Sequence, residues 1–350
     1  MRQEMIKYFV EEIKKNISLI GRKIKVMEVC GTHTVSIYKN GLHILFKDYI
    51  DFISGPGCPV CVTSQGYIDE LINLSKDNVL YVFGDMLKVP GEKYSLSWAK
   101  ANGADIRIMY SPVDVVDKVS DDKNYVIAAV GFETTAPAFA LALERTIKSN
   151  KKNIKFAVQL KTIENPLKVL IENNNAVDAF ILPGHVSAIV GVKGFRFMKE
   201  YCIPSVIAGF DGIQMLRAIN TLSKNLLSKK FEVSNEYPEV VTEEGNVLAQ
   251  NLIDKYFERC DAYFRGIGNI SESGLKIRSQ FSQYNYPLKE MQDINKRGCR
   301  CADVLIGKIK PFECGLFGKI CSPQNPQGAC MVSTEGSCAA YYKYGKWLNE

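Results

Sequence analysis

The sequence has no uninterrupted apolar run of the ~20 residues that a helix needs to span a bilayer. At the N-terminus, Glu4, Glu11 and Glu12 interrupt the apolar residues, so residues 1–15 predict an amphipathic helix and not a signal peptide. We therefore expect a cytoplasmic protein without membrane insertion.

The sequence also has no strong excess of charge. Its 350 residues carry 44 basic and 38 acidic side chains, a net charge of +6, and the basic residues are dispersed. No motif that combines aromatic and basic residues stands out, so nucleic-acid binding is not indicated. The loops contain neither GxxxxGK[ST] nor GxGxxG, and phosphate binding therefore has little support.

Histidine is scarce, with three residues, whereas cysteine is abundant, with eleven. In a reducing compartment, clustered cysteines bind metal or carry out redox chemistry more often than they form structural disulfides. Cys202 and Cys260 are isolated in the sequence, and we expect both to be buried as small hydrophobic residues. His43 lies in an apolar context, which indicates a structural role.

Short β-rich runs alternate with helix-like segments through the first part of the chain. This alternation predicts an α/β fold with mostly parallel sheets. We expect two α/β domains, residues 1–118 and 119–213, which face each other across a cleft. The predicted strands are residues 24–29, 49–53, 79–83, 105–110, 125–130, 154–158, 179–182 and 204–209.

Residues 214–350 differ in composition from the first part. Helices are expected over residues 215–227 and within 237–259, and residues 266–274 read as a loop. The last fifty residues are rich in glycine, cysteine and proline, which fits a segment held by a cofactor better than one held by its own core. We expect residues 214–350 to form a third domain, mainly helical and irregular.

Unusual loops follow the predicted strands. Ligands of open α/β sheets bind beyond the carboxyl ends of the strands, so we expect these loops to gather in one cleft. The loops are Cys30-Gly-Thr-His-Thr34, Gly55-Pro-Gly-Cys-Pro-Val-Cys61, Phe83-Gly-Asp-Met86, Gly131-Phe-Glu-Thr-Thr-Ala-Pro137 and Pro183-Gly-His-Val-Ser187.

Cys58 and Cys61 have CxxC spacing, which can close a disulfide, hold a metal or exchange electrons. The prolines around them make the loop stiff, and the glycines allow a sharp turn. A zinc site completed by Cys30 and His33 is an alternative, but the stiff loop favours disulfide exchange.

Six further cysteines lie within forty residues near the C-terminus, with no histidine among them. Thiolate-only ligation suits zinc or an iron–sulfur cluster. The segment has neither CxxC knuckles nor the CxxCxxC run of ferredoxins, and spacing alone does not choose four ligands from the six. Two leftover thiols beside a cluster would make a natural dithiol/disulfide relay.

The five strand-end motifs and the C-terminal cysteines occur in this order along the whole chain. Each motif alone is a weak to moderate signal, but six in order are highly specific. Together they resemble the HypD family of hydrogenase maturation factors.

This resemblance implies two Rossmann-like domains, a cluster domain and a role in building the Fe(CN)2CO unit of [NiFe]-hydrogenases. Two partners follow: a HypC-type chaperone that shares the iron, and a HypE-type donor that supplies cyanide from a carbamoyl-derived thiocyanate. Cys301 and Cys330 are left as a redox pair. The ligands implied for a [4Fe-4S] cluster are Cys299, Cys314, Cys321 and Cys338.

The same resemblance implies that Cys30 is a ligand of the transient iron that carries the CN and CO ligands. Cys58 and Cys61 become a reversible dithiol near this iron, reached by electrons from the cluster through Cys301 and Cys330. Taken alone, Cys30 fits a buried structural cysteine, although helix N-terminal amides near the strand end would favour its thiolate.

His33 and His185 both lie in strand-end loops. An imidazole there can bind a metal, place protons as cyanide leaves its carrier, or satisfy backbone groups. The residues alone leave these roles open.

Glu133 is a candidate contact for a partner or ligand, but its motif also fits a helix start with Thr134 or Thr135 as N-cap. Asp85 has the same ambiguity. Glu335 lies between two C-terminal cysteines, where it either tunes the cluster or caps a helix.

Two other functions stay open, and whether the protein catalyses a reaction by itself is undecided. A stand-alone iron–sulfur thiol–disulfide oxidoreductase would turn over a dithiol substrate without any partner. A nucleotide-binding α/β protein with structural zinc would lack the visible absorption of a cluster, because zinc has no d-electron transitions.

Overall fold

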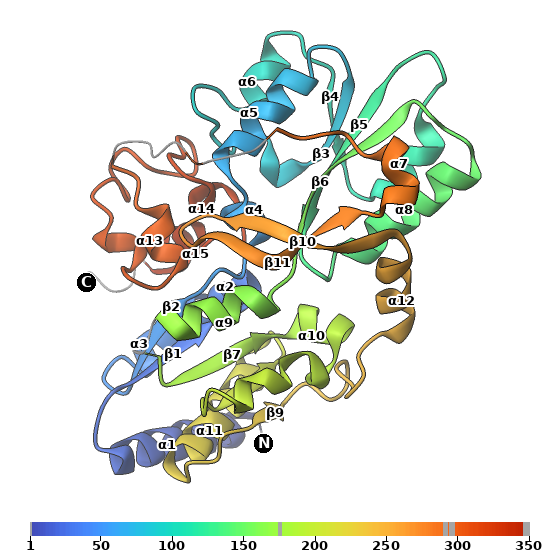
Figure 1. Ribbon diagram of the computed structural model, residues 1–350. Coiled ribbons are helices and arrows are strands. Elements are labelled where there is room, and N and C mark those ends of the chain that lie inside the picture. Colours follow the sequence, from blue (N-terminus) through green and yellow to red (C-terminus); the bar gives the residue numbers. More distant parts are fainter. Residues whose placement is uncertain (1, 174–176, 290–292, 294–297, 346–350) are drawn as a thin grey trace.

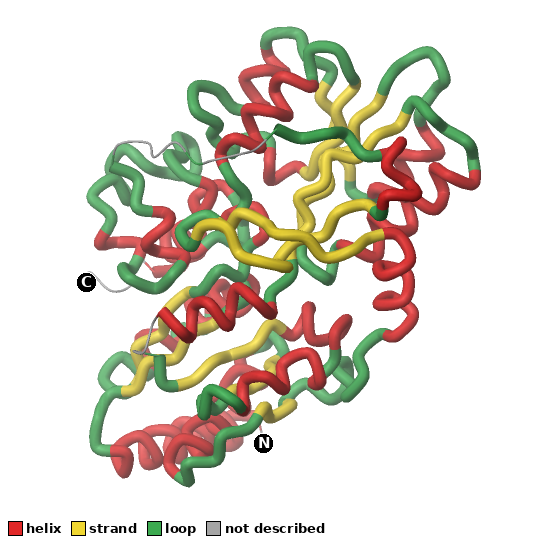
Figure 2. The backbone as a smooth tube through the Cα atoms, in the orientation of Figure 1, coloured by secondary structure: helices red, strands yellow, loops and turns green. Residues whose placement is uncertain are grey.

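The computed structural model describes residues 2–345 except for 174–176, 290–292 and 294–297. Two sheets, each accompanied by helices, form the upper and lower parts of the molecule in Figure 1, and the C-terminal segment lies beside them. The strands and connecting loops can be followed in Figure 2. The predicted α/β class with mostly parallel sheets is confirmed.

The first sheet is parallel throughout, in the order β2-β1-β7-β8-β9. Helices α1 (Arg2–Ile20) and α11 (Gly212–Leu227) bury their apolar residues against one face of it, with Ile13 and Ile17 of α1 in the shared core. The strands are β1 (Ile24–Glu28), β2 (Ile50–Ser54), β7 (Ala179–Pro183), β8 (Ser205–Ala208) and β9 (Val233–Asn235).

The second sheet has the order β10-β11-β6-β5-β3-β4 and is mixed. Strand β5 is buried at every position, as expected for a central strand covered on both faces. The parallel strands are β3 (Val79–Phe83), β4 (Ile106–Met109), β5 (Tyr125–Gly131) and β6 (Ile154–Lys161), and the antiparallel strands are β10 (Phe257–Phe264) and β11 (Gly268–Ile277).

Helices cover the second sheet and begin at side chains that suit a helix start. Ser64 caps α5 (Gln65–Leu74), and Ser111 caps α7 (Pro112–Lys118), each accepting a backbone N–H. The other helices with a sheet-covering role are α6 (Leu96–Ala101), α8 (Ala136–Lys148), α9 (Glu164–Asn173) and α12 (Val247–Tyr256).

Short helices occupy the strand-end loops and the C-terminal segment. They are α2 (Gly31–Lys39), α3 (Leu42–Leu45), α4 (Pro59–Val62), η1 (Gly84–Met86), α10 (Gly184–Val190), η2 (Val192–Lys199), η3 (Ser279–Tyr284), α13 (Cys301–Leu305), η4 (Pro311–Glu313), α14 (Ala329–Val332) and α15 (Ser337–Tyr344).

The sheets do not follow the order of the strands in the sequence. Strands β1 and β2 pair with β7 to β9, whereas β3 and β4 pair with β5 and β6. The expectation that residues 1–118 and residues 119–213 each supply one sheet is therefore wrong, because parallel neighbours are set by helix crossovers and not by sequence distance. The domain boundaries themselves, at residues 118 and 213, stay a prediction.

The segment after α12 was also predicted incorrectly. Residues 257–264 and 268–277 form a hairpin that extends the second sheet next to β6, where a helix end and a loop were expected. Gly266, in the connection, has a φ of +87°, which favours the glycine that is present. The serines and glycines of β11 give it little strand propensity of its own, so its pairing partners stabilise it.

Two isolated cysteines are more accessible than expected. Cys202 is exposed and Cys260, in β10, is partly exposed, so neither is a buried hydrophobic residue. Among the described residues, no helix is long and apolar enough to cross a membrane.

Candidate functional site

The loops after β1 and β2 lie side by side, because the two strands are parallel neighbours. A Cβ atom at Gly57 would lie 2.3 Å from the backbone nitrogen of Cys30. The Gly57 carbonyl also accepts a hydrogen bond from the N–H of Gly31, at 3.5 Å. Glycine at position 57 therefore allows the CxxC loop to rest directly on Cys30.

Cys30 is the N-cap residue of α2 and is buried. Its carbonyl accepts the N–H of His33 at 2.9 Å, and its own N–H donates to Glu28 Oε2 at 3.1 Å. Burial, and then the negative charge of Glu335, raise the pKa of Cys30 to about 12. The backbone amides of His33 and Thr32 at the helix start do lower this pKa, as expected, but burial outweighs them. The thiol is therefore protonated at neutral pH, and a metal ion must displace that proton.

Glu28, at the end of β1, was not identified from the sequence. It is buried, and it accepts hydrogen bonds from the Thr34 hydroxyl and the Cys30 N–H. Burial raises the pKa of Glu28 to about 8. The available signal was an acidic residue directly after the apolar pair Val26 and Met27, two residues before Cys30.

Cys58 and Cys61 form a disulfide, with their Cα atoms 5.2 Å apart. Cys58 is the N-cap residue of α4, and its sulfur accepts the N–H of Cys61 at 3.2 Å. The two residues are 3% and 0% exposed, so the disulfide is shielded from solvent. Because these thiols are bonded to each other, the alternative zinc site with Cys30 and His33 is not formed in this structure.

Both loop histidines stack on Phe210, which follows β8. The ring centroids of His33 and Phe210 are 4.8 Å apart, and those of His185 and Phe210 are 4.1 Å apart. His33 is fully buried, with Nε2 3.1 Å from the Ala208 carbonyl and no hydrogen-bond partner for Nδ1. Burial lowers the pKa of His33 to about 4, so this ring is neutral at pH 7, whereas His185 is exposed.

Glu133 follows β5 and lines a hollow of about 390 Å³. Its Oε1 accepts the N–H of Ile163 at 2.9 Å, whereas its Oε2 has no hydrogen-bond partner. Burial raises the pKa of Glu133 to about 7. Thr135 is the N-cap residue of α8, so the predicted helix start is confirmed, although its side chain makes no capping hydrogen bond.

The C-terminal segment reaches back to the strand-end loops. Glu335 accepts a hydrogen bond from the Thr32 hydroxyl at 2.8 Å, and Ser333 Oγ lies 3.4 Å from Asp85 Oδ2. A Cβ atom at Gly31 would lie 2.1 Å from the Glu335 carbonyl oxygen. Glu335 therefore contacts the Cys30 helix, and its side chain bonds Thr32.

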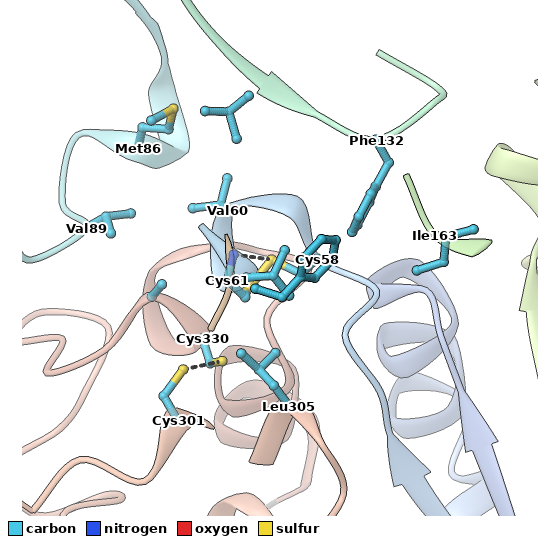
Figure 3. Close-up of a cluster of buried hydrophobic side chains, with 14 of the residues drawn as sticks. Cys58, Val60, Cys61, Met86, Val89, Phe132, Ile163, Cys301, Leu305 and Cys330 are labelled. Atoms are coloured by element: carbon cyan, nitrogen blue, oxygen red, sulfur yellow. Dashed lines mark hydrogen bonds between the residues drawn. A yellow bond between two sulfur atoms is a disulfide. The ribbon is translucent and has the colours of Figure 1, made fainter. Parts of the chain in front are cut away.

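Cys301 and Cys330 come from α13 and α14 and face each other, with their sulfur atoms 2.7 Å apart (Figure 3). Both are buried in the same hydrophobic cluster as Cys58 and Cys61, and α14 packs against α4. The hydrogen bond with Cys330 and burial raise the pKa of the Cys301 thiol well above its usual value. The structure thus brings the two predicted redox pairs together.

The other C-terminal cysteines surround the same region. A Cβ atom at Gly328 would lie 2.8 Å from Cys299 Sγ, and Cys321 Sγ accepts the N–H of Gln327 at 3.4 Å. Cys299 interacts electrostatically with Cys314 and Cys321, and Cys338 does so with Cys299 and Cys321. Within the described ranges, no three His, Cys, Asp or Glu residues are grouped as they would be around a single metal ion.

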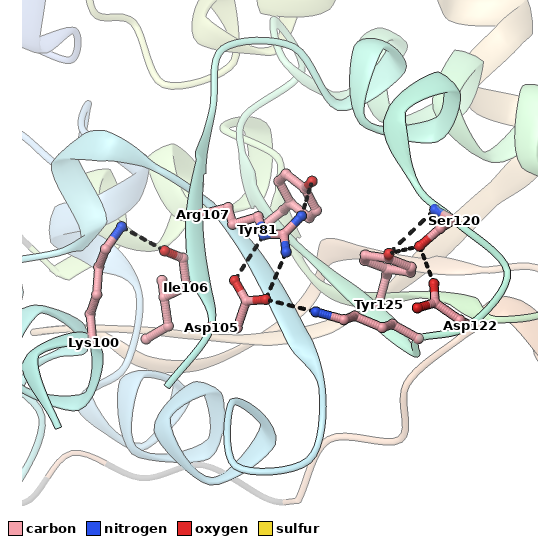
Figure 4. Close-up of polar contacts among 9 residues, drawn as sticks. Tyr81, Lys100, Asp105, Ile106, Arg107, Ser120, Asp122 and Tyr125 are labelled. Atoms are coloured by element: carbon pink, nitrogen blue, oxygen red, sulfur yellow. Dashed lines mark hydrogen bonds and ion pairs between the residues drawn. The ribbon is translucent and has the colours of Figure 1, made fainter. Parts of the chain in front are cut away.

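A hollow of about 690 Å³ lies at the opposite, amino edge of β3, β4 and β5. Two of its acidic residues are paired: Asp105 with Arg107 at 2.7 Å, and Asp122 with the Ser120 hydroxyl, which lies 2.8 Å from the Tyr125 hydroxyl (Figure 4). This network has a structural explanation, and it lies far from the cysteine-bearing loops.

Comparison with known proteins agrees with the motifs. A family model described as HypD, hydrogenase formation hypA family, matches residues 4–345. The chain is 36% identical to the hydrogenase maturation factor HypD of Escherichia coli K12, over 99% of this chain and 97% of that protein. It is 39% identical to a putative hydrogenase expression/formation protein of Methanocaldococcus jannaschii, over 97% of each chain.

The family match covers nearly the whole chain, and so do these relatives. The chain belongs to the HypD family of hydrogenase maturation factors.

Proposed function

We propose that this protein is the cytoplasmic scaffold on which the Fe(CN)2CO unit of [NiFe]-hydrogenases is assembled. One observation carries the proposal: three cysteine sites lie in succession, with the Cys58–Cys61 loop resting on Cys30 and α14, which carries Cys330, packed against α4. Membership of the HypD family supplies the hydrogenase context.

Iron is the substrate in this proposal, and Cys30 is its ligand on this chain. A HypC-type chaperone supplies another ligand and shares the iron. Cys30 is buried and its pKa is raised, so iron binding must displace the thiol proton. Glu28 is hydrogen-bonded to the Cys30 N–H, and its pKa of about 8 is close to neutrality. We assign to Glu28 the role of accepting that proton.

Cyanide arrives on a HypE-type donor as a thiocyanate, and its release is a reduction. The carrier takes up two electrons and one proton, its S–C bond to cyanide breaks, and it leaves as a thiol while the cyanide ion binds iron. The reduced Cys58 and Cys61 supply both electrons and two protons as they form their disulfide, and the second proton goes to solvent. The structure holds this pair in the oxidised form that the step produces.

Cys301 and Cys330 regenerate the dithiol. In thiol–disulfide exchange, their two thiols transfer two electrons and two protons to the Cys58–Cys61 disulfide and become a disulfide themselves. Their sulfur atoms are 2.7 Å apart, so only a small movement is needed to form the bond between them.

The C-terminal thiols fit a [4Fe-4S] cluster. The donor set is entirely sulfur, its members interact electrostatically, and a Cβ atom at Gly328 would lie 2.8 Å from Cys299 Sγ. When bound, the cluster supplies electrons. The residues proposed to hold it are Cys299, Cys314, Cys321 and Cys338.

Access to the site requires movement of the loops, because Cys30, Cys58 and Cys61 are all buried. We assign this opening to the binding of the chaperone and of the cyanide donor. His33 and His185 lie in adjacent loops and share Phe210, so both rings shift if this residue moves.

The first test is iron analysis of the anaerobically purified complex with the HypC-type chaperone. Cys30→Ala should lose the non-cluster iron and the infrared bands of bound cyanide, while the visible absorption and the iron and sulfide of the cluster remain. Unchanged non-cluster iron and unchanged cyanide bands would reject the proposal.

A stand-alone thiol–disulfide oxidoreductase receives less support. Such an enzyme would need the same loop movement, because Cys58 and Cys61 are 3% and 0% exposed, and it would leave the adjacent Cys30 without a role.

A further inference from the structure

The hollow of about 390 Å³ that Glu133 lines is formed by elements of both sheets. Strands β10 and β11 and the loops after β5 and β6 belong to the second sheet, whereas α10 and η2 follow β7 of the first sheet. Helices α10 and α12 contact each other at this junction (Figure 1). None of the described residues that line the hollow is a cysteine, so it is separate from the cysteine sites. Its volume is in the range of small-molecule pockets, ~300–1,000 Å³.

Glu133 brings a buried oxygen without a protein partner to this hollow. The residue is 6% exposed, and its Oε1 accepts the N–H of Ile163 at 2.9 Å. Its Oε2 has no hydrogen-bond partner on the protein. A buried carboxyl oxygen left unsatisfied costs free energy of folding. Where such an oxygen belongs to a residue that lines a cavity, it is available to a ligand.

The basic side chains that line the hollow cannot balance the charge of Glu133, because each one forms an ion pair with another carboxylate. The ion pairs are Lys193–Glu244, Arg278–Glu258 and Arg259–Glu164. Asp254, the remaining acidic residue of the lining, is exposed to solvent. When Glu133 is ionised, it therefore contributes a buried negative charge that lacks an ion-pair partner within the described part of the chain.

Apolar side chains form much of the remaining lining. Ile253, Phe257 and Leu275 are buried and come from α12, β10 and β11. At Gly194, a Cβ atom would lie 2.5 Å from Cγ2 of Val190, so a larger residue there would displace a side chain of the lining. One unpaired acidic oxygen among apolar walls suits a ligand that combines a positively charged N–H donor with a short hydrocarbon body.

We propose that this hollow binds a primary ammonium group carried on a short alkyl chain, with Glu133 Oε2 as its anionic acceptor. An ammonium group has three N–H donors, and its single charge balances that of Glu133. A free alkylamine and the lysine side chain of a partner protein both carry this group. The site lies outside the cysteine machinery, so the inference does not depend on the proposed function.

Other ligands fit less well. An anion would meet the unpaired charge of Glu133. A divalent cation needs several oxygen ligands, and among the residues that the structure describes no three His, Cys, Asp or Glu are grouped as they would be around a metal ion. A primary ammonium therefore matches the hollow in both charge and hydrogen bonding.

Titration of the full-length chain with n-butylammonium chloride, followed by calorimetry, tests the site. We expect saturable binding at one site per chain. Butyrate, which has a similar body and the opposite charge, should not bind. Tetramethylammonium keeps the charge but has no N–H, so it should bind at least ~10-fold more weakly.

Two matched variants test the role of Glu133. Glu133→Gln removes the charge at almost unchanged size, and it should weaken n-butylammonium binding by ~10-fold or more. Glu258→Gln is the control, because Glu258 lines the same hollow and already pairs with Lys276 at 3.3 Å. Its affinity should stay within about threefold of the wild type, since a partly exposed ion pair contributes little. Thermal unfolding checks that both variants are folded.

The pH dependence of wild-type binding keeps the test decisive if Glu133→Gln does not fold. Burial raises the pKa of Glu133 to about 7, and an alkylammonium stays charged up to about pH 10. Protonation of Glu133 removes the charge that the ligand needs, so affinity should rise from about pH 5 to about pH 8. The other charged residues that face the hollow are Glu164, Lys193, Asp254, Glu258, Arg259 and Arg278.

Competition identifies the source of the ammonium group. If a lysine of the HypC-type or HypE-type partner fills the hollow, saturating n-butylammonium and Glu133→Gln should both weaken that complex. If a free amine fills it, the complexes should be unaffected, and either result supports the site. No saturable binding of n-butylammonium, equal binding of butyrate, or an affinity that neither pH nor Glu133→Gln changes would overturn the inference.

Discussion

The two buried cysteine pairs are built differently. Cys58 and Cys61 belong to one helical turn at the end of a sheet strand, three residues apart, and they are bonded. Cys301 and Cys330 are 29 residues apart on two short helices, and their sulfurs are 2.7 Å apart. A local turn is enough to form the first pair, whereas the second depends on everything that orders the C-terminal segment.

The first pair is therefore held more rigidly than the second. The first pair is held by the loop prolines, by the close contact of Gly57 with Cys30 and by strand β2. The second pair is held by α13 and α14, which contain five and four residues, and the thiols around it are expected to be ordered by a bound cluster. A stiff acceptor beside an adjustable donor suits repeated disulfide exchange.

The largest effect should come from breaking each pair. Cys58→Ser with Cys61→Ser should lower assembly of cyanide ligands by several orders of magnitude, since the reductant of the proposed step is lost. Cys301→Ser should lower it less, by roughly 10–100-fold, because an external reductant can replace the relay. Infrared bands of iron-bound cyanide measure both, and Cys202→Ser, an exposed cysteine, is the control. An equal loss of cyanide bands in the two sets of variants would show that the two pairs do not differ in this way.

A glycine beside each pair offers the next comparison. Gly57→Ala should destabilise the fold by about 1–3 kcal/mol, because its Cβ would meet backbone atoms of Val29 and Cys30. Gly328→Ala meets the movable Cys299 side chain, so it should cost less stability and more cluster iron. Denaturant unfolding and iron analysis give both quantities.

Gly315→Ala is the matched control for these substitutions, since nothing lies within 4 Å of a Cβ there. If Gly57→Ala lost cluster iron and Gly328→Ala lost only stability, the assignment of the two sites would be reversed.

The smallest effect is a pH dependence of folding stability that arises from Glu133. Burial raises the pKa of Glu133 to about 7 from 4.5, so the folded state keeps a proton that the unfolded state releases. Its contribution to stability is full below pH 4.5 and falls as pH rises to about 7, by at most ~1.4 kcal/mol per pH unit. Glu133→Gln should flatten that part of the stability profile, and an unchanged slope would show that Glu133 titrates normally.

Much of the α/β part could be predicted from the sequence. The expected strand at residues 79–83 is β3, and the apolar runs at 125–130 and 179–182 fall in β5 and β7, because buried parallel strands read as continuous apolar runs. The partners of β1 could not be predicted: β7 lies more than 100 residues later, and helix packing decides that neighbour.

Motifs located part of the candidate site and missed the rest. Cys30, Cys58, Cys61 and the C-terminal cysteines stand out because their residue type and spacing are unusual. Glu28 and Phe210 belong to no spacing pattern. Glu28 matters because it is buried beside Cys30, and Phe210 matters because it stacks on His33, which is distant in the chain, and on His185. Sequence reasoning cannot find such residues before the fold is known.

The order of the strands has a mechanical consequence. The backbone crosses from one sheet to the other after β2, after β6 and after β9, so three connections join the sheets. Helix α4, with its disulfide, is part of the first connection. Any hinge motion between the sheets must therefore move the connection that contains Cys58 and Cys61. Reduction of their disulfide would make that connection less stiff.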